Sequence, residues 1–207
     1  LDVELEIIPV VSLDDVFSGL VNNQADIAAA ALSITPARQE TLLFGPSYLS
    51  VKQYFIYNRD VNSPMSSIED LIGKQIRVIS NTAHAEQLKT LQNEHPELTW
   101  MESRDLETID LLEQLADGQI DATIVNSTEY YANRAFYPSF RIAFSAGKPR
   151  KLAWAMAASP ANASLIKEMT IFFKGITENG KLARLIDRNF TLNERQTFIS
   201  THTFLQM

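Results

Sequence analysis

The chain has 207 residues, of which 45% are apolar and 21% are charged, so it can fill a core and does not have the composition of a disordered segment. Its net charge of −7 argues against a nucleic-acid-binding surface, because contacts to phosphates need a basic face. It has no cysteine, which excludes disulfides and thiol catalysis, and no apolar run approaches the roughly 20 residues needed to span a bilayer.

Segments with the pattern of strands alternate with segments with the pattern of helices. The apolar positions predict strands near residues 3–10, 26–33, 51–57, 75–80, 98–103, 120–126, 140–145 and 151–157. They predict helices near residues 13–22, 83–93, 105–117, 127–136, 160–178 and 180–189. This alternation is typical of α/β architecture and favours largely parallel strands.

Two polar linker-like segments predict a division of the chain into two lobes. They are "NRDVNSPMSSIEDLIGKQ" (58–75) and "SAGKPRK" (145–151). Because the chain would cross twice, we expect a discontinuous lobe 1 of residues 1–57 plus 151–207 and a lobe 2 of residues 58–150. "LVNNQADIA" (20–28) is similar to "LADGQIDAT" (115–123), which fits either two similar lobes or a turn pattern common to many such units.

Both ends of the sequence have the pattern of internal segments. "LDVELEIIPV" (1–10) alternates like a strand, begins with Leu1 and has no signal-peptide pattern. "NERQTFISTHTFLQM" (193–207) is still amphipathic at its last residue. We therefore expect that the chain begins inside a larger protein and that a further element follows Met207.

The segment "ADIAAAALSITPARQETLLFGPSY" (25–48) places a cation just after a buried strand. Thr35 and Pro36 are typical of the start of a helix, and Arg38 then lies in its first turn, where the helix dipole disfavours a positive charge. A ligand carboxylate, bound by this guanidinium and by the N–H groups of helix starts, would explain the charge. The alternatives are that Arg38 pairs with Glu40 or is solvated.

Ligands of open α/β sheets bind beyond the carboxyl ends of the strands. Three predicted strand ends are rich in hydroxyl and amide groups and directly precede helices: residues 33–35, 80–82 and 126–128. If the two lobes face each other, these ends line a cleft between them.

Several segments resemble the family 3 extracellular solute-binding proteins. Residues 25–48 have that family's pattern of Asp, a small apolar run, Ser-Ile-Thr-x-x-Arg, and a later Phe and Tyr. Its later landmarks resemble, in order, "LIGKQIRVISNTAHAEQL" (71–88), "LADGQIDATIVNS" (115–127) and "NGKLARLIDRNF" (179–190). The resemblance implies an α/β, two-lobed periplasmic binding protein-like fold (type II), with the family's first strand–helix unit missing from this sequence.

The resemblance also implies a set of ligand-binding residues. The family's carboxylate-binding pair falls on Ser33 and Arg38, its second-lobe contact falls on Thr82, and Leu13 takes the position of a side chain that packs on the ligand. Asn126 falls where transporters of amino acids carry an Asp that pairs with the ligand's ammonium group. Because Asn is neutral, a buried ammonium would lack its charge partner, which favours a blocked or acylated amine, such as that of a peptidoglycan stem peptide.

One branch of the family resembles the chain in further segments. They are "GPSYLSVKQYFIYN" (45–58), "HPELTW" (95–100) and "DRNFTLNERQTFISTHTFL" (187–205). In that branch the binding domain precedes a lysozyme-like domain that cleaves peptidoglycan. The resemblance therefore implies a periplasmic, non-catalytic domain that binds a small molecule and regulates a downstream catalytic domain, in a parent protein attached to the outer membrane through the missing N-terminus.

Two other functions fit the same sequence. One is a solute-binding protein that delivers amino acids to an ABC-type transporter, and the other is a domain that has lost its ligand and only docks partners. The downstream sequence of the parent gene would separate the first of these from a regulatory domain.

The sequence predicts no catalytic site, metal or cofactor. The three histidines, His84, His95 and His202, lack metal-ligand spacing, and no GxSxG or phosphate-binding loop occurs. His84 fits either the cleft edge or a solvated position. Lytic transglycosylases use a Glu-Ser pair at the catalytic acid, but Glu102-Ser103 here follows a strand-like segment, whereas the catalytic pair belongs to an all-helical fold.

Overall fold

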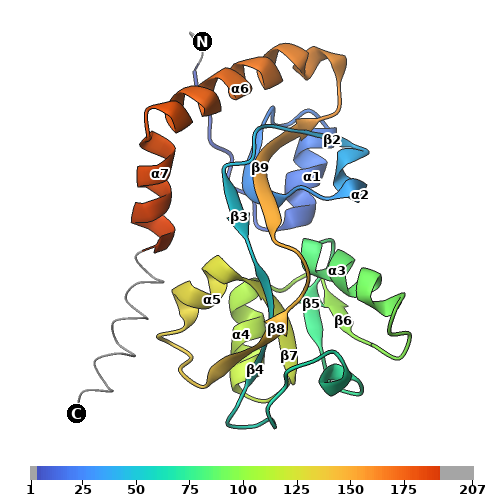
Figure 1. Cartoon of the computed structure of the whole chain (residues 1–207). Helices are drawn as coiled ribbons and strands as arrows, with labels where there is room; N and C mark the ends of the chain where they lie inside the picture. The colour runs from blue at the N-terminus through green and yellow to red at the C-terminus, as the bar shows by residue number, and fades with distance from the viewer. Residues whose placement is uncertain (1–3, 192–207) are drawn as a thin grey trace, which may run out of the picture.

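The computed structural model describes residues 4–191, which fold into α-helices and short β-strands (Figure 1). The helices are α1 (Leu13–Val21), α2 (Pro36–Gln39), α3 (Ala83–Gln92), α4 (Thr108–Ala116), α5 (Ser127–Asn133), α6 (Ala163–Glu178) and α7 (Lys181–Ile186). The strands are β1 (Ala28–Ser33), β2 (Leu42–Phe44), β3 (Leu49–Val51), β4 (Gln53–Asn58), β5 (Arg77–Ile79), β6 (Met101–Ser103), β7 (Ala122–Asn126), β8 (Phe140–Ser145) and β9 (Arg150–Ala157). Within residues 4–191, no helix combines the length and apolar character needed to cross a membrane.

The strands form separate sheets in two lobes. In the first lobe, β9 lies between β1 and β2 and also pairs with β3, and helices α1, α2 and α6 surround this sheet. In the second lobe, β4 lies between β7 and β8, β5 pairs with β6, and helices α3, α4 and α5 pack around them. Figure 1 shows the chain passing between the lobes twice, from β3 to β4 and from β8 to β9.

The strand directions correct the expectation of a largely parallel arrangement. Strand β9 is antiparallel to β1, β2 and β3, and β4 is antiparallel to β7 and β8, whereas β5 and β6 are parallel. The expectation assumed that each strand returns to the sheet of the strand before it. Here β4 and β9 enter their sheets from the other lobe, so they run against their neighbours.

Residues 4–10 correct a second expectation, because they form no strand. Leu5 and Ile7 are 83% and 81% exposed, although their alternation with charged residues is typical of a strand. A strand needs a neighbour for its backbone hydrogen bonds, and no strand within residues 4–191 pairs with this segment. Alternation alone therefore did not determine its structure.

The central strand of each lobe is buried on both of its faces. Phe55 and Ile56, adjacent on β4, are fully buried and belong to different apolar clusters. Ala155 and Met156 on β9 are divided between two clusters in the same way. Successive side chains of a strand point to opposite faces, so each strand joins two cores, and each large buried apolar side chain contributes about 1.5–3 kcal/mol.

The strand pairing indicates at which residues the chain passes from one lobe to the other. Because β4 pairs with β7 and β8, we propose that the first crossing lies at Lys52, between β3 and β4, rather than after residue 57. The second crossing lies between β8 and β9, at residues 146–149, next to the predicted boundary. The part of the predicted first lobe at residues 192–207 lies outside the described residues.

Candidate ligand-binding site

The first side of the candidate site is the turn between β1 and α2. Thr35 is the N-cap of α2, where its hydroxyl accepts the Arg38 backbone N–H at 3.3 Å, and Pro36 follows at the first helical position. Arg38 is only 8% exposed, so a solvated position is wrong. The local sequence therefore forms the expected helix start, with a buried guanidinium in its first turn.

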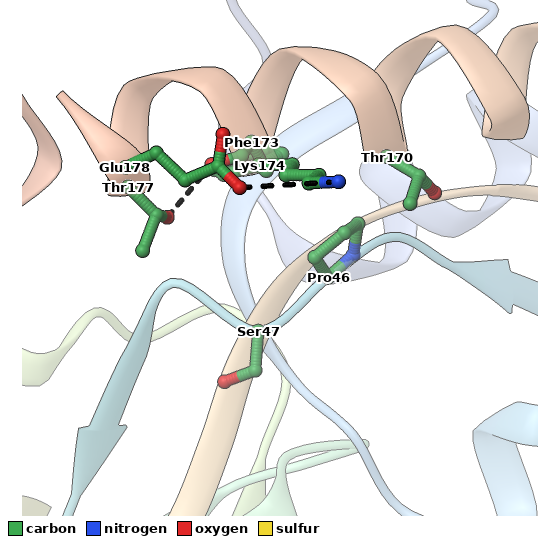
Figure 2. Close-up of a pocket in the computed structure, with 7 residues that line it drawn as sticks. All are labelled: Pro46, Ser47, Thr170, Phe173, Lys174, Thr177 and Glu178. Atoms are coloured by element: carbon green, nitrogen blue, oxygen red, sulfur yellow. Dashed lines mark hydrogen bonds and ion pairs between the residues drawn. The ribbon is translucent and has the colours of Figure 1, made fainter.

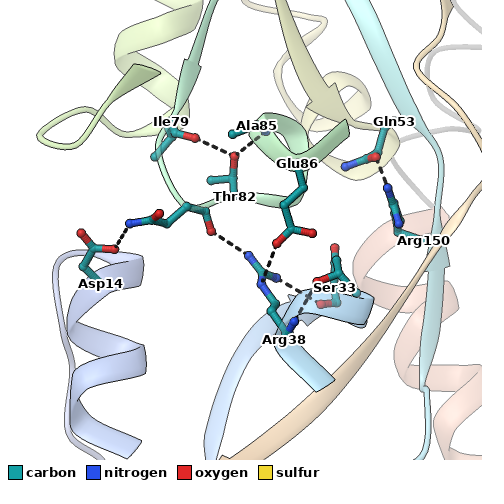
Figure 3. Close-up of polar contacts among 11 residues, drawn as sticks. Asp14, Ser33, Arg38, Gln53, Ile79, Thr82, Ala85, Glu86 and Arg150 are labelled. Carbon is teal, nitrogen blue, oxygen red and sulfur yellow. Dashed lines mark hydrogen bonds and ion pairs between the residues drawn. The ribbon is translucent and has the colours of Figure 1, made fainter. Parts of the chain in front are cut away.

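The Arg38 guanidinium points across to the second lobe (Figure 3). Its Nη1 donates to the Ser33 carbonyl at 3.1 Å, and its Nη2 donates to the carbonyl of Asn81 at 2.9 Å. Its Nε lies 3.8 Å from Oε1 of Glu86, so its ionic partner is Glu86 rather than the expected alternative Glu40. The charge is thus matched by acceptors from the second lobe, which explains its tolerance in the first turn of a helix.

The surroundings of Arg38 affect its electrostatics. Burial lowers the pKa of the guanidinium, and the Glu86 carboxylate acts in the opposite direction. The ring of Phe17 on α1 also lies 5.1 Å from the guanidinium carbon, at the distance of a cation–π contact. Since an arginine stays protonated in proteins, Arg38 is a fixed positive charge between the lobes.

The second side of the site is the start of α3. Thr82 is the N-cap, where its hydroxyl accepts the Ala85 N–H at 3.3 Å and donates to the Ile79 carbonyl at 2.6 Å. The residue before it, Asn81, has φ of 59°, and its side-chain amide donates to Asp14 of α1 at 2.7 Å. The start of α3 therefore contacts the first lobe through both the backbone and the side chain of Asn81.

Asn126 and His84 lie at a neighbouring part of the second lobe. Asn126 is the N-cap of α5, and its backbone N–H donates to Glu129 at 2.7 Å. Its Oδ1 lies 3.3 Å from Nε2 of His84, whose side chain is half-buried, which favours the cleft-edge alternative for His84. Burial lowers the pKa of His84, while Glu129 and the contact with Asn126 raise it. The imidazole is therefore biased toward its neutral form.

The structure brings most of the predicted site residues together. Ser33 and Arg38 are in direct contact, and Thr82 directly follows Asn81, which binds Arg38. Asn126 reaches the same helix start through His84. Leu13 is the first residue of α1 and packs against the apolar cluster of the first lobe. The ligand-binding roles of these five residues stay predictions.

Three residues that contact Arg38 were not singled out in the sequence: Phe17, Asn81 and Glu86. Phe17 follows Leu13 by one helical turn, so helical spacing could have placed both on one face of α1. Asn81 belongs to a predicted strand end, but its carbonyl carries the contact, and backbone contacts leave no sequence signal. Glu86 is one of many exposed-looking acids, and its pairing with Arg38 depends on how the lobes meet.

A separate groove lies along the outer helix α6 (Figure 2). It has a volume of about 360 Å³ and is lined by Pro46, Ser47, Thr170, Phe173, Lys174, Thr177 and Glu178. Lys174 and Glu178 form an ion pair at 3.8 Å, and the Thr177 hydroxyl donates to the Phe173 carbonyl at 2.7 Å. Its charged groups thus contact each other, and it shares no residue with the Arg38 site.

In the part of the chain that the structure describes, no group of three or more His, Cys, Asp or Glu side chains could hold a metal ion. Glu102 lies on β6, accepts a hydrogen bond from Trp100 at 3.1 Å and pairs with Lys89 at 3.3 Å. It is therefore a strand residue within a surface network.

Comparison with solved structures confirms the two-lobed α/β fold. A mutant of the arginine-binding protein ArgBP from T. maritima matches with a TM-score of 0.79 at 20% identity, covering 91% of this chain and 79% of that one. An amino acid ABC transporter substrate-binding protein from Streptococcus pneumoniae, bound to L-arginine, matches with a TM-score of 0.77 at 23% identity, covering 92% of this chain and 78% of that one.

Sequence comparison identifies closer relatives and the family. A membrane-bound lytic murein transglycosylase F from Saccharophagus degradans is 40% identical over 182 residues, covering 88% of this chain and 36% of that protein. Another from Pseudomonas fluorescens is 36% identical over 207 residues, covering 100% of this chain and 42% of that protein. The chain thus spans about two fifths of these relatives' length. The profile of the bacterial extracellular solute-binding proteins, family 3, matches residues 1–192, and the chain belongs to that family.

Proposed function

We propose that this chain is a periplasmic, non-catalytic domain that binds a small carboxylate-bearing ligand between its lobes and thereby regulates a peptidoglycan-cleaving domain of the same protein. The observation that carries the proposal is the buried Arg38 guanidinium, which faces the second lobe from the start of α2. A guanidinium fork matches the two oxygens of a carboxylate, and buried charged groups of proteins are paired.

A ligand carboxylate could replace Glu86 as the ionic partner of Arg38. Glu86 lies 3.8 Å from Nε, beyond ordinary hydrogen-bond length, and its side chain is 30% exposed. A ligand carboxylate can accept shorter, charge-assisted hydrogen bonds from the same guanidinium. The backbone N–H groups at the start of α3, after its N-cap Thr82, offer further donors from the second lobe.

Asn126 supports a ligand whose amine is blocked. Asn126 is the N-cap of α5 and its side-chain amide contacts His84, and it carries no charge to match a ligand's ammonium group. Because an unpaired buried ammonium is costly, an acylated amino acid or a peptide, such as a peptidoglycan stem peptide, fits this position better than a free amino acid.

The regulatory part of the proposal rests on the relatives. Their names describe membrane-bound enzymes that act on murein, and this chain covers only 36–42% of the two compared above. Ligand binding would change the equilibrium between two arrangements of the lobes, hinged at Lys52 and residues 146–149. A downstream domain that contacts the lobes differently in these arrangements would respond to the ligand. The names of the relatives support attachment to a membrane, and we propose that the protein lies in the periplasm and that this membrane is the outer membrane.

A second candidate is delivery of an amino acid to an ABC-type transporter. The observation that favours it is the close structural likeness to an amino acid ABC transporter substrate-binding protein, with a TM-score of 0.77. Under this function the ligand would carry a free ammonium group, and a group other than the neutral Asn126 would have to match its charge.

A thermal-shift titration distinguishes these functions. The protein is heated with a peptidoglycan stem tripeptide, with free L-amino acids, and with neither. A ligand at about 100 times its Kd adds about 2.7 kcal/mol, which raises the Tm of a chain of this size by several degrees. A shift with the stem peptide that Arg38→Gln abolishes supports the proposal. A shift with free amino acids alone supports delivery to a transporter, and no shift with either contradicts ligand binding.

A further inference from the structure

A second guanidinium lies at the candidate site, on the strand that returns to the first lobe. Arg150 is the first residue of β9 and is half-buried. Its Nη2 donates to Oε1 of Gln87 at 2.7 Å. Its Nε donates to Oε1 of Gln53 at 3.4 Å, as Figure 3 shows. Both partners are neutral amides, and Arg150 forms no ion pair within residues 4–191. Its positive charge is therefore not matched by a side chain of the described part of the chain.

Gln53 next to it has a buried donor without an acceptor. This side chain is 1% exposed, and its Oε1 is turned toward Arg150. Its Nε2 has no hydrogen-bond partner among the residues that the structure describes. Buried donors of native proteins are almost always satisfied, so an exception calls for a physical reason.

Gln87, the other partner of Arg150, is held in place by the loop before β9. Gly147 has φ of +129°, a conformation that favours glycine, and a Cβ added there would lie 3.0 Å from Nε2 of Gln87. Gln87 itself is 8% exposed. The close approach of Gly147 thus confines Gln87, which in turn orients the guanidinium of Arg150.

The two guanidinium groups are neighbours across α3. Glu86 contacts Arg38, and the next residue of the helix, Gln87, contacts Arg150. The charge of Arg150 is close enough to Arg38 to lower its pKa further, after the larger effect of burial. A ligand at Arg38 would therefore lie within reach of a second, unmatched fork.

We propose that Arg150 and Gln53 form a second anion-binding position for the same ligand, which therefore carries two carboxylates. One carboxylate would bind Arg38, and the other would accept hydrogen bonds from Arg150 and from the free Nε2 of Gln53. This inference rests on the proposed function and narrows it to dicarboxylates, such as an acylated acidic amino acid or a peptide with an acidic residue. In the alternative, Arg150 serves only to join β9 to Gln53 and Gln87.

Isothermal titration calorimetry with two matched probes tests this proposal. N-acetyl-L-glutamate and N-acetyl-L-glutamine differ only in whether the side chain is a carboxylate or an amide. The wild-type protein is expected to bind the glutamate probe at least tenfold more tightly. Arg150→Gln is expected to bring the two affinities within threefold of each other, while the affinity for the glutamine probe changes less than threefold.

Matched variants distinguish a failure of the second anion-binding position from a failure of the proposed function. Lys151→Gln removes the same charge from the next, exposed residue of β9 and is expected to keep the preference. Gln53→Leu removes the free Nε2 and is expected to reduce the preference, which provides a second variant if Arg150→Gln does not fold. Equal affinities of the wild-type protein for the probes, or a preference that survives Arg150→Gln, would overturn the second position. Failure of both probes to bind the wild-type protein would instead contradict the proposed function.

Discussion

The two sides of the candidate site differ in what they offer to a ligand. The first lobe presents a fixed cation, Arg38, together with the ring of Phe17. The second lobe presents acceptors, which are the carbonyl of Asn81 and the carboxylate of Glu86, beside the capped start of α3. Because the second lobe already supplies Arg38 with acceptors, a ligand carboxylate would bind by exchange, and its affinity would be a difference between two sets of contacts.

Removing the guanidinium of Arg38 should have the strongest effect on ligand affinity. Arg38→Gln loses charge-assisted hydrogen bonds worth about 3 kcal/mol, so the affinity for N-acetyl-L-glutamate should fall roughly hundredfold or more in calorimetry. Arg59→Gln removes the same charge from an exposed side chain and should leave the affinity unchanged. An Arg38→Gln protein that binds within twofold of wild type would show that the cation does not hold the ligand.

The second effect is the pH dependence of stability that His84 of the second lobe should cause. Its pKa in the folded protein is lowered, chiefly by burial, from the ordinary value of 6.5. Below about pH 6.5 the unfolded chain therefore binds a proton that the folded chain does not, and the free energy of unfolding should decrease by up to about 1.4 kcal/mol per pH unit. Above that pH, this contribution should be fully present and constant.

Urea unfolding at pH 7.5, 6.5 and 5.5 measures this dependence. Carboxylates also titrate toward the acid end, so the test is the difference between wild type and His84→Gln. The variant should lose less stability than wild type on acidification. Parallel pH profiles of the two proteins would mean that the imidazole is not held neutral at the site.

A smaller effect is expected at the start of α3. Thr82→Ala removes the N-cap hydroxyl, which typically stabilises a helix start by about 1 kcal/mol, and should lower the Tm by roughly 2–4 °C. Thr82→Ser retains a hydroxyl and should retain most of the Tm in a thermal melt. Equal losses in the two variants would indicate that the threonine methyl, and not the cap, carries the stability.

The smallest effect tests whether a ligand carboxylate replaces Glu86 as the partner of Arg38. Glu86→Gln removes the carboxylate that pairs with Arg38, and a long, partly exposed ion pair contributes less than about 1 kcal/mol. The affinity for N-acetyl-L-glutamate should therefore rise, by up to about fivefold. Glu40→Gln, an exposed acid of the same charge near Arg38 in sequence, is the control. Weaker binding by Glu86→Gln would mean that Glu86 supports the ligand rather than competing with it.

Local features of the site could be predicted from the sequence. Thr35 and Pro36 start α2, and Thr82 starts α3, because capping depends on side chains a few residues away. The resemblance to the family added the two-lobed fold, which local patterns alone only suggested. The positions of Ser33 and Arg38 at the interlobe contact follow from the same two sources.

Features that depend on distant contacts could not be predicted. The pairing of Arg38 with Glu86 and the contact of Arg150 with Gln87 depend on how two lobes meet across the whole chain. The prediction of largely parallel strands was wrong for the same reason, since β4 and β9 enter their sheets from the opposite lobe. Residues 4–10 show that an apolar alternation forms a strand only where a partner is present.

The crystal structure of the protein bound to N-acetyl-L-glutamate is the most direct measurement of where the ligand binds. We expect one ligand carboxylate within hydrogen-bond distance of the Arg38 guanidinium, with Glu86 displaced from it, and the second carboxylate at Arg150 and Gln53. Density for the ligand in the α6 groove, with Glu86 still paired to Arg38, would contradict the account.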